Sequence, residues 1–193
     1  VKRLFDLAVS SILLLLTFPI LLVTALCVVI ESGLPVFYRQ DRRGANGRVF
    51  TLYKLRSMKN GAESGGNPRW AAVDDDRTTA VGRIIRKLRI DELPQIINVF
   101  KGEMSFVGPR PERPFFVDQL MTQIPHYSLR HCVKPGITGW AQVNGYRGVT
   151  DSIDKMRRRV DHDLFYIDHW SLMFDIKIMI KTVLSPRSYR NAY

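Results

Sequence analysis

The chain has 193 residues, 46% of them apolar, which suits a single globular domain of ordinary size with its own core. Lys and Arg number 29 against 18 Asp and Glu, and the net charge of +11 indicates an anionic partner: nucleic acid, a lipid surface or a phosphorylated substrate. The two cysteines, Cys27 and Cys132, and the four histidines lack the spacing of a zinc site, and two cysteines do not make a disulfide framework.

An uncharged apolar segment runs from Leu7 to Ile30. As a straight helix it would measure about 36 Å, against a bilayer hydrocarbon core of about 30 Å. Pro19 lies near its middle and predicts a break, with Thr17 placed to bond a freed carbonyl, and each half would reach only about 18 Å. Basic residues flank both ends, and basic flanks prefer the cytoplasmic side. We therefore favour a re-entrant membrane helix in residues 1–35; a kinked transmembrane helix and a buried core helix are the alternatives.

Short elements follow the apolar segment. Val36–Gln40 and Val49–Leu55 are typical of strands, and the turn residues between them predict a hairpin. Ala80–Arg89 has apolar residues at helical spacing and is predicted to be a helix. Its other side chains are mostly basic, and they form either a solvated face or a face close to lipid or substrate phosphates. A second helix is predicted from Leu93 to Lys101, with Pro94 in its first turn.

Two helices are predicted near the C-terminus, Ser152–Tyr166 and Leu172–Leu184. The second is charged and too short to span a membrane, so it lies either in the membrane interface or in the core. The predicted fold is therefore α+β and mostly helical: a re-entrant helix broken at Pro19, a small β-hairpin and amphipathic interfacial helices. No linker divides the remainder, so residues 36–193 are expected to form one domain packed on the membrane interface.

Adjacent carboxylates, Asp91 and Glu92, stand at the predicted start of a helix, where free N–H groups favour negative charge and should keep both ionised at neutral pH. An ionised aspartate can attack phosphorus when a divalent cation and arginines offset the repulsion between like charges. Arg86 lies one turn before Asp91, and Arg110 is held between two prolines in a direction suited to phosphate oxygens. By itself such a pair is also typical of plain helix caps.

The pair lies within a longer pattern that resembles the bacterial sugar transferase family, the monotopic polyprenyl-phosphate phosphoglycosyl transferases that initiate glycan and exopolysaccharide assembly. The matching stretches, in chain order, are Lys2–Asp6, Tyr38–Gly44, Phe50–Met58, Asp91–Gln95, Met104–Pro111 and Lys134–Gly145. They cover nearly the whole chain. One departure is Phe18 before Pro19, where the family often has serine.

The resemblance implies transfer of a sugar 1-phosphate from a UDP-sugar to polyprenyl (undecaprenyl) phosphate, with Asp91 as the nucleophile that forms a covalent phosphosugar intermediate. It implies Mg2+ as cofactor, with Asp91, Glu92 and Asp163 as metal residues. Glu92 would hold the metal or manage the acceptor's proton, and a structural ion pair is the alternative for Asp163. It also implies the re-entrant helix and a catalytic domain, residues 36–193, on the cytoplasmic face of the bacterial inner membrane.

Five basic residues are candidates for binding phosphates or the nucleotide. Arg86 and Arg110 match basic positions of the family that suit the lipid phosphate and the nucleotide phosphates. Lys54 and Arg56 either contact phosphate or have a solvated or structural role. Arg147 either faces the nucleotide or sugar or belongs to a tight turn. Rival functions are a membrane-anchored nucleic-acid binder and a non-catalytic scaffold; no nucleic-acid motif is present, so we expect no nucleic-acid partner, and a homo-oligomer is compatible with the sequence.

Overall fold

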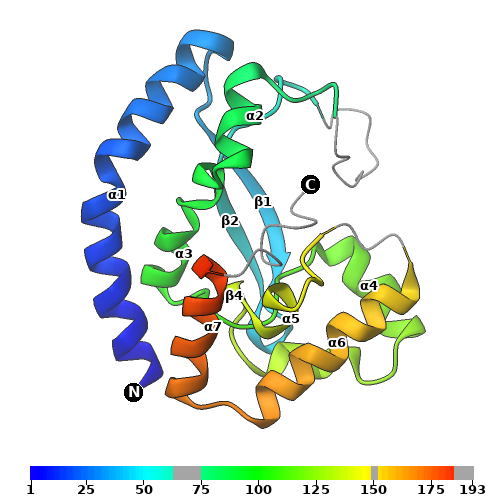
Figure 1. Ribbon diagram of the computed structural model, residues 1–193. Helices are drawn as coiled ribbons and strands as arrows, with labels where there is room; N and C mark the ends of the chain where they lie inside the picture. Colours follow the sequence, from blue (N-terminus) through cyan, green and yellow to red (C-terminus); the bar gives the residue numbers. More distant parts are fainter. Residues whose placement is uncertain (63–74, 149–151, 185–193) are drawn as a thin grey trace.

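The computed structural model describes residues 1–62, 75–148 and 152–184. Its helices are α1 Lys2–Ser32, α2 Ala80–Lys87, α3 Gln95–Lys101, α4 Pro114–Gln123, α5 Trp140–Val143, α6 Ile153–Asp168 and α7 Leu172–Leu184. Its strands are β1 Phe37–Arg43, β2 Val49–Leu55, β3 Ser105–Val107 and β4 Gly136–Thr138. Figure 1 shows α1 along one side of the molecule, α2 and α3 beside it, and α4 and α6 on the opposite side. The fold is α+β and mostly helical, as predicted.

The predicted hairpin is confirmed. β1 and β2 pair antiparallel, with Phe37 opposite Leu55 at the open end and Arg43 opposite Val49 next to the turn. The turn contains Gly47 at a φ of 72°, a left-handed conformation that glycine adopts at no steric cost. This hairpin carries Lys54 near its open end, which places that side chain beside α3 and the turn before it.

The parallel pair of β3 and β4 was not predicted, because each strand has only three residues and shows no alternation of its own. Glycines make the pairing possible. A Cβ added at Gly136 would lie 2.1 Å from the backbone nitrogen of Gly108, so the two chains approach too closely for a side chain. The pair anchors the segment that follows β3, which bears Arg110.

Pro19 lies inside α1, and the helix continues through it from Lys2 to Ser32. The helix curves along the molecule (Figure 1), so the predicted break takes the form of a bend. Thr17 donates to the carbonyl of Leu13 at 2.6 Å. Proline deprives the carbonyl four residues earlier, that of Leu15, of its donor, so the prediction that Thr17 bonds a freed carbonyl is wrong.

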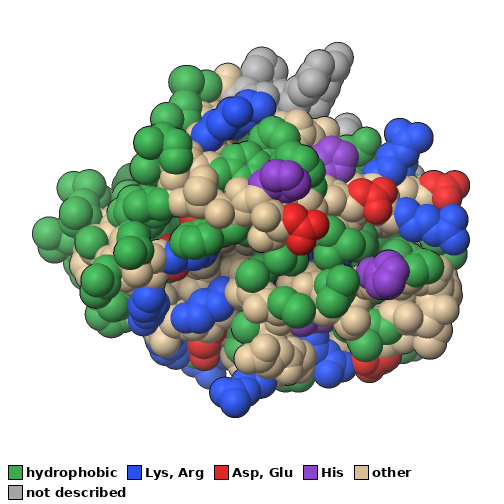
Figure 2. Space-filling model, turned by 90° about the horizontal axis from the view of Figure 1, so that it is seen from below, with side chains coloured by type: hydrophobic (Ala, Val, Ile, Leu, Met, Phe, Trp, Pro, Cys, Tyr) green, Lys and Arg blue, Asp and Glu red, His purple; other side chains and the backbone are tan. Residues whose placement is uncertain are grey.

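The two faces of α1 are inverted relative to a helix of a water-soluble protein. The residues buried against the rest of the chain are Asp6, Ser10, Thr24 and Val28, three of which are polar. Large apolar side chains are exposed on the outer face: Leu4, Ile12, Leu15, Leu16, Phe18, Ile20, Leu22, Val23, Leu26, Val29 and Ile30. Figure 2 shows hydrophobic side chains gathered over the edge that α1 forms.

Only 11% of the most apolar 18-residue stretch of α1 is buried, so the alternative of a buried core helix is wrong. Within the described residues, α1 is the one helix that is long and apolar enough to cross a membrane. An uncovered apolar surface of this size is unfavourable in water. The helix therefore indicates association with a membrane.

The main core lies between α1, β2, α3 and the C-terminal helices. Its buried members are Leu52, Ile96, Val99, Met104, Phe106, Val107, Val143, Tyr166 and Ile178. A second cluster joins α4 to α6 through Val117, Met156 and Val160, and a third joins α1, β2 and α2 through Val28, Leu55 and Ile85. The predicted helices α2, α3, α6 and α7 are confirmed, whereas α4 was not predicted. α7 buries Ile178 but exposes Ile180, Val183 and Leu184, so it is both a core helix and an apolar surface.

Candidate active site

The two predicted catalytic carboxylates occupy a short 3-10 turn, Ile90–Glu92, between α2 and α3. Arg89 precedes this turn with a φ of 59°, a left-handed conformation that interrupts the helical path after α2. As a result, Asp91 and Glu92 point into the protein and are only 4% and 8% exposed. Buried carboxylates are unfavourable unless paired, so their surroundings determine what each can do.

Glu92 is surrounded by cations. Its Oε1 accepts hydrogen bonds from Lys54 Nζ at 3.0 Å and from Arg110 Nη2 at 2.9 Å, and its Oε2 accepts one from Arg147 Nη2 at 2.5 Å. Burial alone would raise the pKa of Glu92, but the charges of these three cations outweigh burial and hold that pKa well below its ordinary value. Glu92 therefore stays ionised and keeps three cations, from three separate segments, at one point.

Asp91 has the opposite environment. Burial raises its pKa to about 6; the charge of Lys54 opposes this rise, and the charge of Glu92 adds to it. At neutral pH the Asp91 carboxyl is therefore ionised in most molecules, as expected. Its pKa is nevertheless above its ordinary value and not below it, as a position at the start of a helix would favour. Its Oδ1 is buried and makes no hydrogen bond within the described part of the chain. This desolvated carboxylate oxygen therefore has an unused capacity to accept a hydrogen bond or to bind a metal ion.

Arg86 lies close enough to Asp91 for its charge to lower the pKa of that carboxyl, and its Nη1 donates to Thr78 Oγ1 at 3.0 Å. The structure thus gathers six of the predicted site residues from across the chain. They are Asp91, Glu92, Arg86, Arg110, Lys54 and Arg147. Four cations around two carboxylates leave a net positive charge, which suits an anionic substrate such as a diphosphate.

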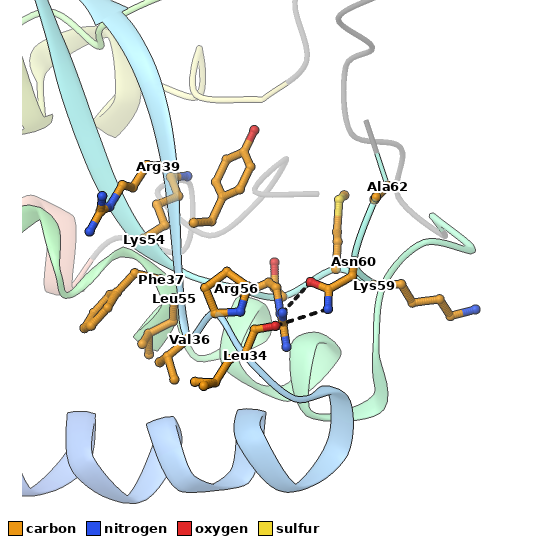
Figure 3. Close-up of a pocket in the computed structure, with 15 residues that line it drawn as sticks. Leu34, Val36, Phe37, Arg39, Lys54, Leu55, Arg56, Lys59, Asn60 and Ala62 are labelled. Atoms are coloured by element: carbon orange, nitrogen blue, oxygen red, sulfur yellow. Dashed lines mark hydrogen bonds between the residues drawn. The ribbon is translucent and has the colours of Figure 1, made fainter. Parts of the chain in front are cut away.

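Arg56 is not part of this group. It is buried and donates to the carbonyl oxygens of Ser32 at 2.9 Å and Gly33 at 2.5 Å, and it also bonds Asn60. These contacts place its charge at the C-terminal end of α1, where free carbonyls and the helix dipole favour a cation. Figure 3 shows Arg56 directed at Asn60 and at the chain around Leu34. The structural role is the one observed, and the phosphate-binding prediction for Arg56 is not supported.

A cavity of about 910 Å³ borders the site. It is lined by residues 34–39 and 54–62, at the open end of the hairpin beside the end of α1 (Figure 3). Lys54 lines the cavity and also reaches Glu92, so one side chain joins the cavity to the carboxylates. Its lining combines cations, such as Arg39, with the exposed apolar residues Leu34 and Phe37. No sequence pattern predicted this cavity, because its walls are two segments that only the fold brings together.

Asp163 lies apart from the two carboxylates. It is buried and accepts a hydrogen bond at 2.8 Å from Arg130 Nε, which is the ion pair left open by the sequence. No group of three metal-binding side chains occurs within the described residues, so Asp91, Glu92 and Asp163 do not form one metal site. Asp163 serves instead as the counter-charge of Arg130, because a buried arginine without a counter-charge is strongly unfavourable.

A magnesium ion still fits at Asp91. Mg2+ is often held by one or two carboxylates together with substrate phosphates and water. The buried, unpartnered Oδ1 of Asp91 meets the first requirement, whereas the oxygens of Glu92 already accept hydrogen bonds from cations. Asp91 is therefore the side chain best placed to hold such an ion.

Fold and site together define a membrane-associated protein whose buried carboxylate pair lies among cations suited to phosphate groups. The chain belongs to the bacterial sugar transferase family, whose model matches residues 1–187, and this confirms the resemblance seen in the sequence.

Three relatives illustrate the match. The UDP-glucose:undecaprenyl-phosphate glucose-1-phosphate transferase of Escherichia coli is 46% identical over 192 residues, covering 100% of this chain and 41% of the relative. The protein of the same description from Caulobacter vibrioides is 44% identical, covering 100% and 72%. The UDP-N-acetylgalactosamine-undecaprenyl-phosphate N-acetylgalactosaminephosphotransferase of Aeromonas hydrophila is 46% identical, covering 95% and 43%. The chain thus spans less than half of the first and third of these relatives.

Proposed function

We propose that this chain transfers a sugar 1-phosphate from a UDP-sugar to undecaprenyl phosphate and so initiates the assembly of a glycan or exopolysaccharide. The observation that carries the proposal is the pairing of two unlike carboxylates: Asp91 with an unpartnered buried oxygen, and Glu92 with three cations gathered on it. The relatives' names, which specify UDP-sugars and undecaprenyl phosphate, support the substrate class.

In the first step, an oxygen of Asp91 attacks the sugar-proximal phosphorus of the UDP-sugar. The bond from this phosphorus to the bridging oxygen breaks, and UMP leaves with that oxygen. In the second step, a phosphate oxygen of undecaprenyl phosphate attacks the same phosphorus, the bond to Asp91 breaks, and the carboxylate is restored. The product is undecaprenyl diphosphate sugar. Splitting the transfer in two lets one site serve both substrates in turn.

The remaining residues stabilise charge. Arg110, Arg147 and Lys54, which Glu92 holds together, can donate to the oxygens of the diphosphate, and Arg86 offsets charge on the side of Asp91. Bound Mg2+, with Asp91 as its protein ligand, would supply further charge neutralisation. With its pKa held low, Glu92 is an organiser of cations rather than a proton carrier at neutral pH.

The membrane part of the proposal is that α1 is re-entrant and that the catalytic domain lies on the cytoplasmic face of the bacterial inner membrane. The exposed apolar face of α1 supports it, as does Pro19 inside the helix, because proline weakens a helix where a bend is needed. Cysteine labelling in intact cells tests it, in a background where the exposed Cys27 and Cys132 are replaced by serine. Cysteines introduced at positions 2 and 45 should both be protected from an impermeant reagent, and labelling of only one of them would show a spanning helix.

The activity is tested by UMP release from UDP-glucose and from UDP-N-acetylgalactosamine, with undecaprenyl phosphate and Mg2+ present. Wild type should release UMP with one of the donors, and Asp91→Asn should not. Asp154→Asn is the matched control, because the Asp154 side chain is 87% exposed on α6. Mass spectrometry of the protein with donor alone should find a phosphosugar adduct on Asp91. Equal UMP release by wild type and Asp91→Asn would refute Asp91 as nucleophile, and no release by wild type would favour the scaffold or nucleic-acid alternatives.

A further inference from the structure

Arg110 and Arg147 reach Glu92 from segments that are far apart in the sequence. Arg110 follows β3, and Arg147 follows α5, and neither residue lies in a helix or a strand. Their guanidinium groups nevertheless meet on the two oxygens of one carboxylate. Irregular segments do not fix the position of a side chain by themselves, so other contacts must hold these two backbones at a constant separation.

Arg159 of α6 makes such contacts with both segments. Its Nη1 donates to Glu112 Oε1 at 2.7 Å, and its Nη2 donates to the carbonyl oxygen of Gly148 at 2.6 Å. Glu112 lies two residues after Arg110, and Gly148 directly follows Arg147. One planar guanidinium, on a regular helix, therefore ties together the two segments that carry the site's arginines.

The environment of Arg159 makes this tie rigid. The residue is only 4% exposed, and removing a partner from a buried charge is strongly unfavourable. Glu112 is equally buried and lies 3.7 Å from Arg42 of β1, whose Nη1 also donates to the carbonyl of Pro111 at 3.0 Å. The segment around Glu112 is thus held from β1 and from α6 together.

A second buried arginine supports the same segment. Arg130 donates to the carbonyl oxygen of Arg110 itself at 3.0 Å, and Asp163 of α6 holds Arg130 in place at 2.8 Å. Helix α6 supplies Arg159 and Asp163 to this network, and the segments packed beside it supply Glu112 and Arg130. A buried ion pair is weak evidence for stability, but a network with fixed donor directions determines geometry.

We propose that Arg159 is a positioning residue of the phosphoryl-transfer site, which keeps Arg110 and Arg147 at the separation at which both act on the substrate's phosphates. This inference rests on the proposed function, where those two arginines bind the diphosphate. Arg159 acts through Glu112 and Gly148. A displacement of about 1 Å at such a site is enough to reduce the rate on the order of a hundredfold.

The test uses Arg159→Lys, which retains the charge but cannot make both directed bonds from one planar group. In the UMP-release assay, kcat/KM should fall on the order of 10- to 100-fold. Arg158→Lys is the matched control: Arg158 is the preceding residue, exposed to solvent, and its replacement should leave kcat/KM within about twofold of wild type.

A double-mutant cycle separates positioning from general structural damage. If Arg159 acts partly through Arg147, then Arg159→Lys should reduce kcat/KM by a clearly smaller factor in an Arg147→Gln background than in wild type. Damage that is independent of the site would give the same factor in both backgrounds. If Arg159→Lys does not fold, Glu112→Gln replaces it in the same cycle, since Glu112 belongs to the same tie.

The outcomes are distinct. Absence of UMP release by wild type would overturn the proposed function itself. An active wild type with Arg159→Lys as active as Arg158→Lys would overturn the positioning role alone, as would equal factors in the two arms of the cycle. A reduced factor in the Arg147→Gln background would establish it.

Discussion

Replacing Asp91 by asparagine should make the protein more stable while removing its activity. Asp91 is 4% exposed, its Oδ1 has no hydrogen-bond partner within the described residues, and burial raises its pKa from 3.8 to about 6. The folded-state pKa thus lies above the unfolded one. Ionised Asp91 therefore costs stability above pH 6, and this cost disappears once the pH falls below 3.8.

A shift of about two pKa units corresponds to about 3 kcal/mol at neutral pH, which is an upper value for what a neutral isostere recovers. The pKa of about 6 already includes the attraction of the surrounding cations for ionised Asp91, so we expect a net gain of about 1–3 kcal/mol. For a chain of this length the melting temperature should rise by about 2–12 °C. The gain should shrink at pH 5, because Asp91 of wild type is then mostly protonated.

The neighbouring carboxylate gives the opposite expectation. The pKa of Glu92 lies below its unfolded value of 4.5, so its contribution to stability is present above that pH and is lost as the pH falls through the folded pKa. Glu92→Gln leaves three cations without their counter-charge and should lower stability by about 3–5 kcal/mol. Thermal unfolding of substrate-free protein in detergent at pH 7.5 compares both variants. Melting of Asp91→Asn at or below the wild-type temperature would refute the reasoning, as would equal shifts in the two variants.

Three further expectations follow from the structure. Because the nucleophile must be ionised, kcat/KM for UMP release should fall about tenfold per pH unit below about pH 6, and a flat profile from pH 5 to 8 would contradict the role of Asp91. Leu15→Lys places a charge on the apolar face of α1, where Leu15 is 78% exposed, at a cost of roughly 3 kcal/mol in a bilayer. It should lower the membrane-bound fraction of the protein in a sedimentation assay, whereas Leu15→Phe should not. Equal sedimentation of the two variants would show that this face does not contact lipid. Asp163→Asn leaves Arg130 buried without its counter-charge and should lower thermal stability regardless of added Mg2+; a loss that Mg2+ reverses would restore the metal role of Asp163.

The sequence predicted those elements that have a period or a cap of their own. The hairpin was found from its turn residues, α2 from the helical spacing of its apolar residues, and α3 from Pro94 at its start. β3 and β4 were missed because three residues show no period, and their pairing depends on the close approach of Gly108 and Gly136.

The site was predicted where neighbouring residues define it, as at Asp91 and Glu92. The site was not predicted where a charged residue pairs with a residue that is distant in the sequence. For Arg56 and Asp163 the sequence left a phosphate or metal role and a structural role open, and the structure shows the structural one: Arg56 caps α1 and Asp163 pairs with Arg130. Arg159 was missed because it follows two exposed arginines and looks like them in the sequence, although it lies one helical turn after buried Met156 and one before buried Asp163.

Removing α1 would not yield a water-soluble form of this protein. Val9 and Leu13 fill part of the main core, and the carboxylate of Asp6 accepts hydrogen bonds from the hydroxyl of Ser105 and the backbone of Phe106. A truncated chain would expose that interior and leave those donors unmatched. Exchange of the outward leucines and isoleucines of α1 for Glu and Lys, with its inner face unchanged, is instead the route to a detergent-free protein suitable for crystallisation or inhibitor screening.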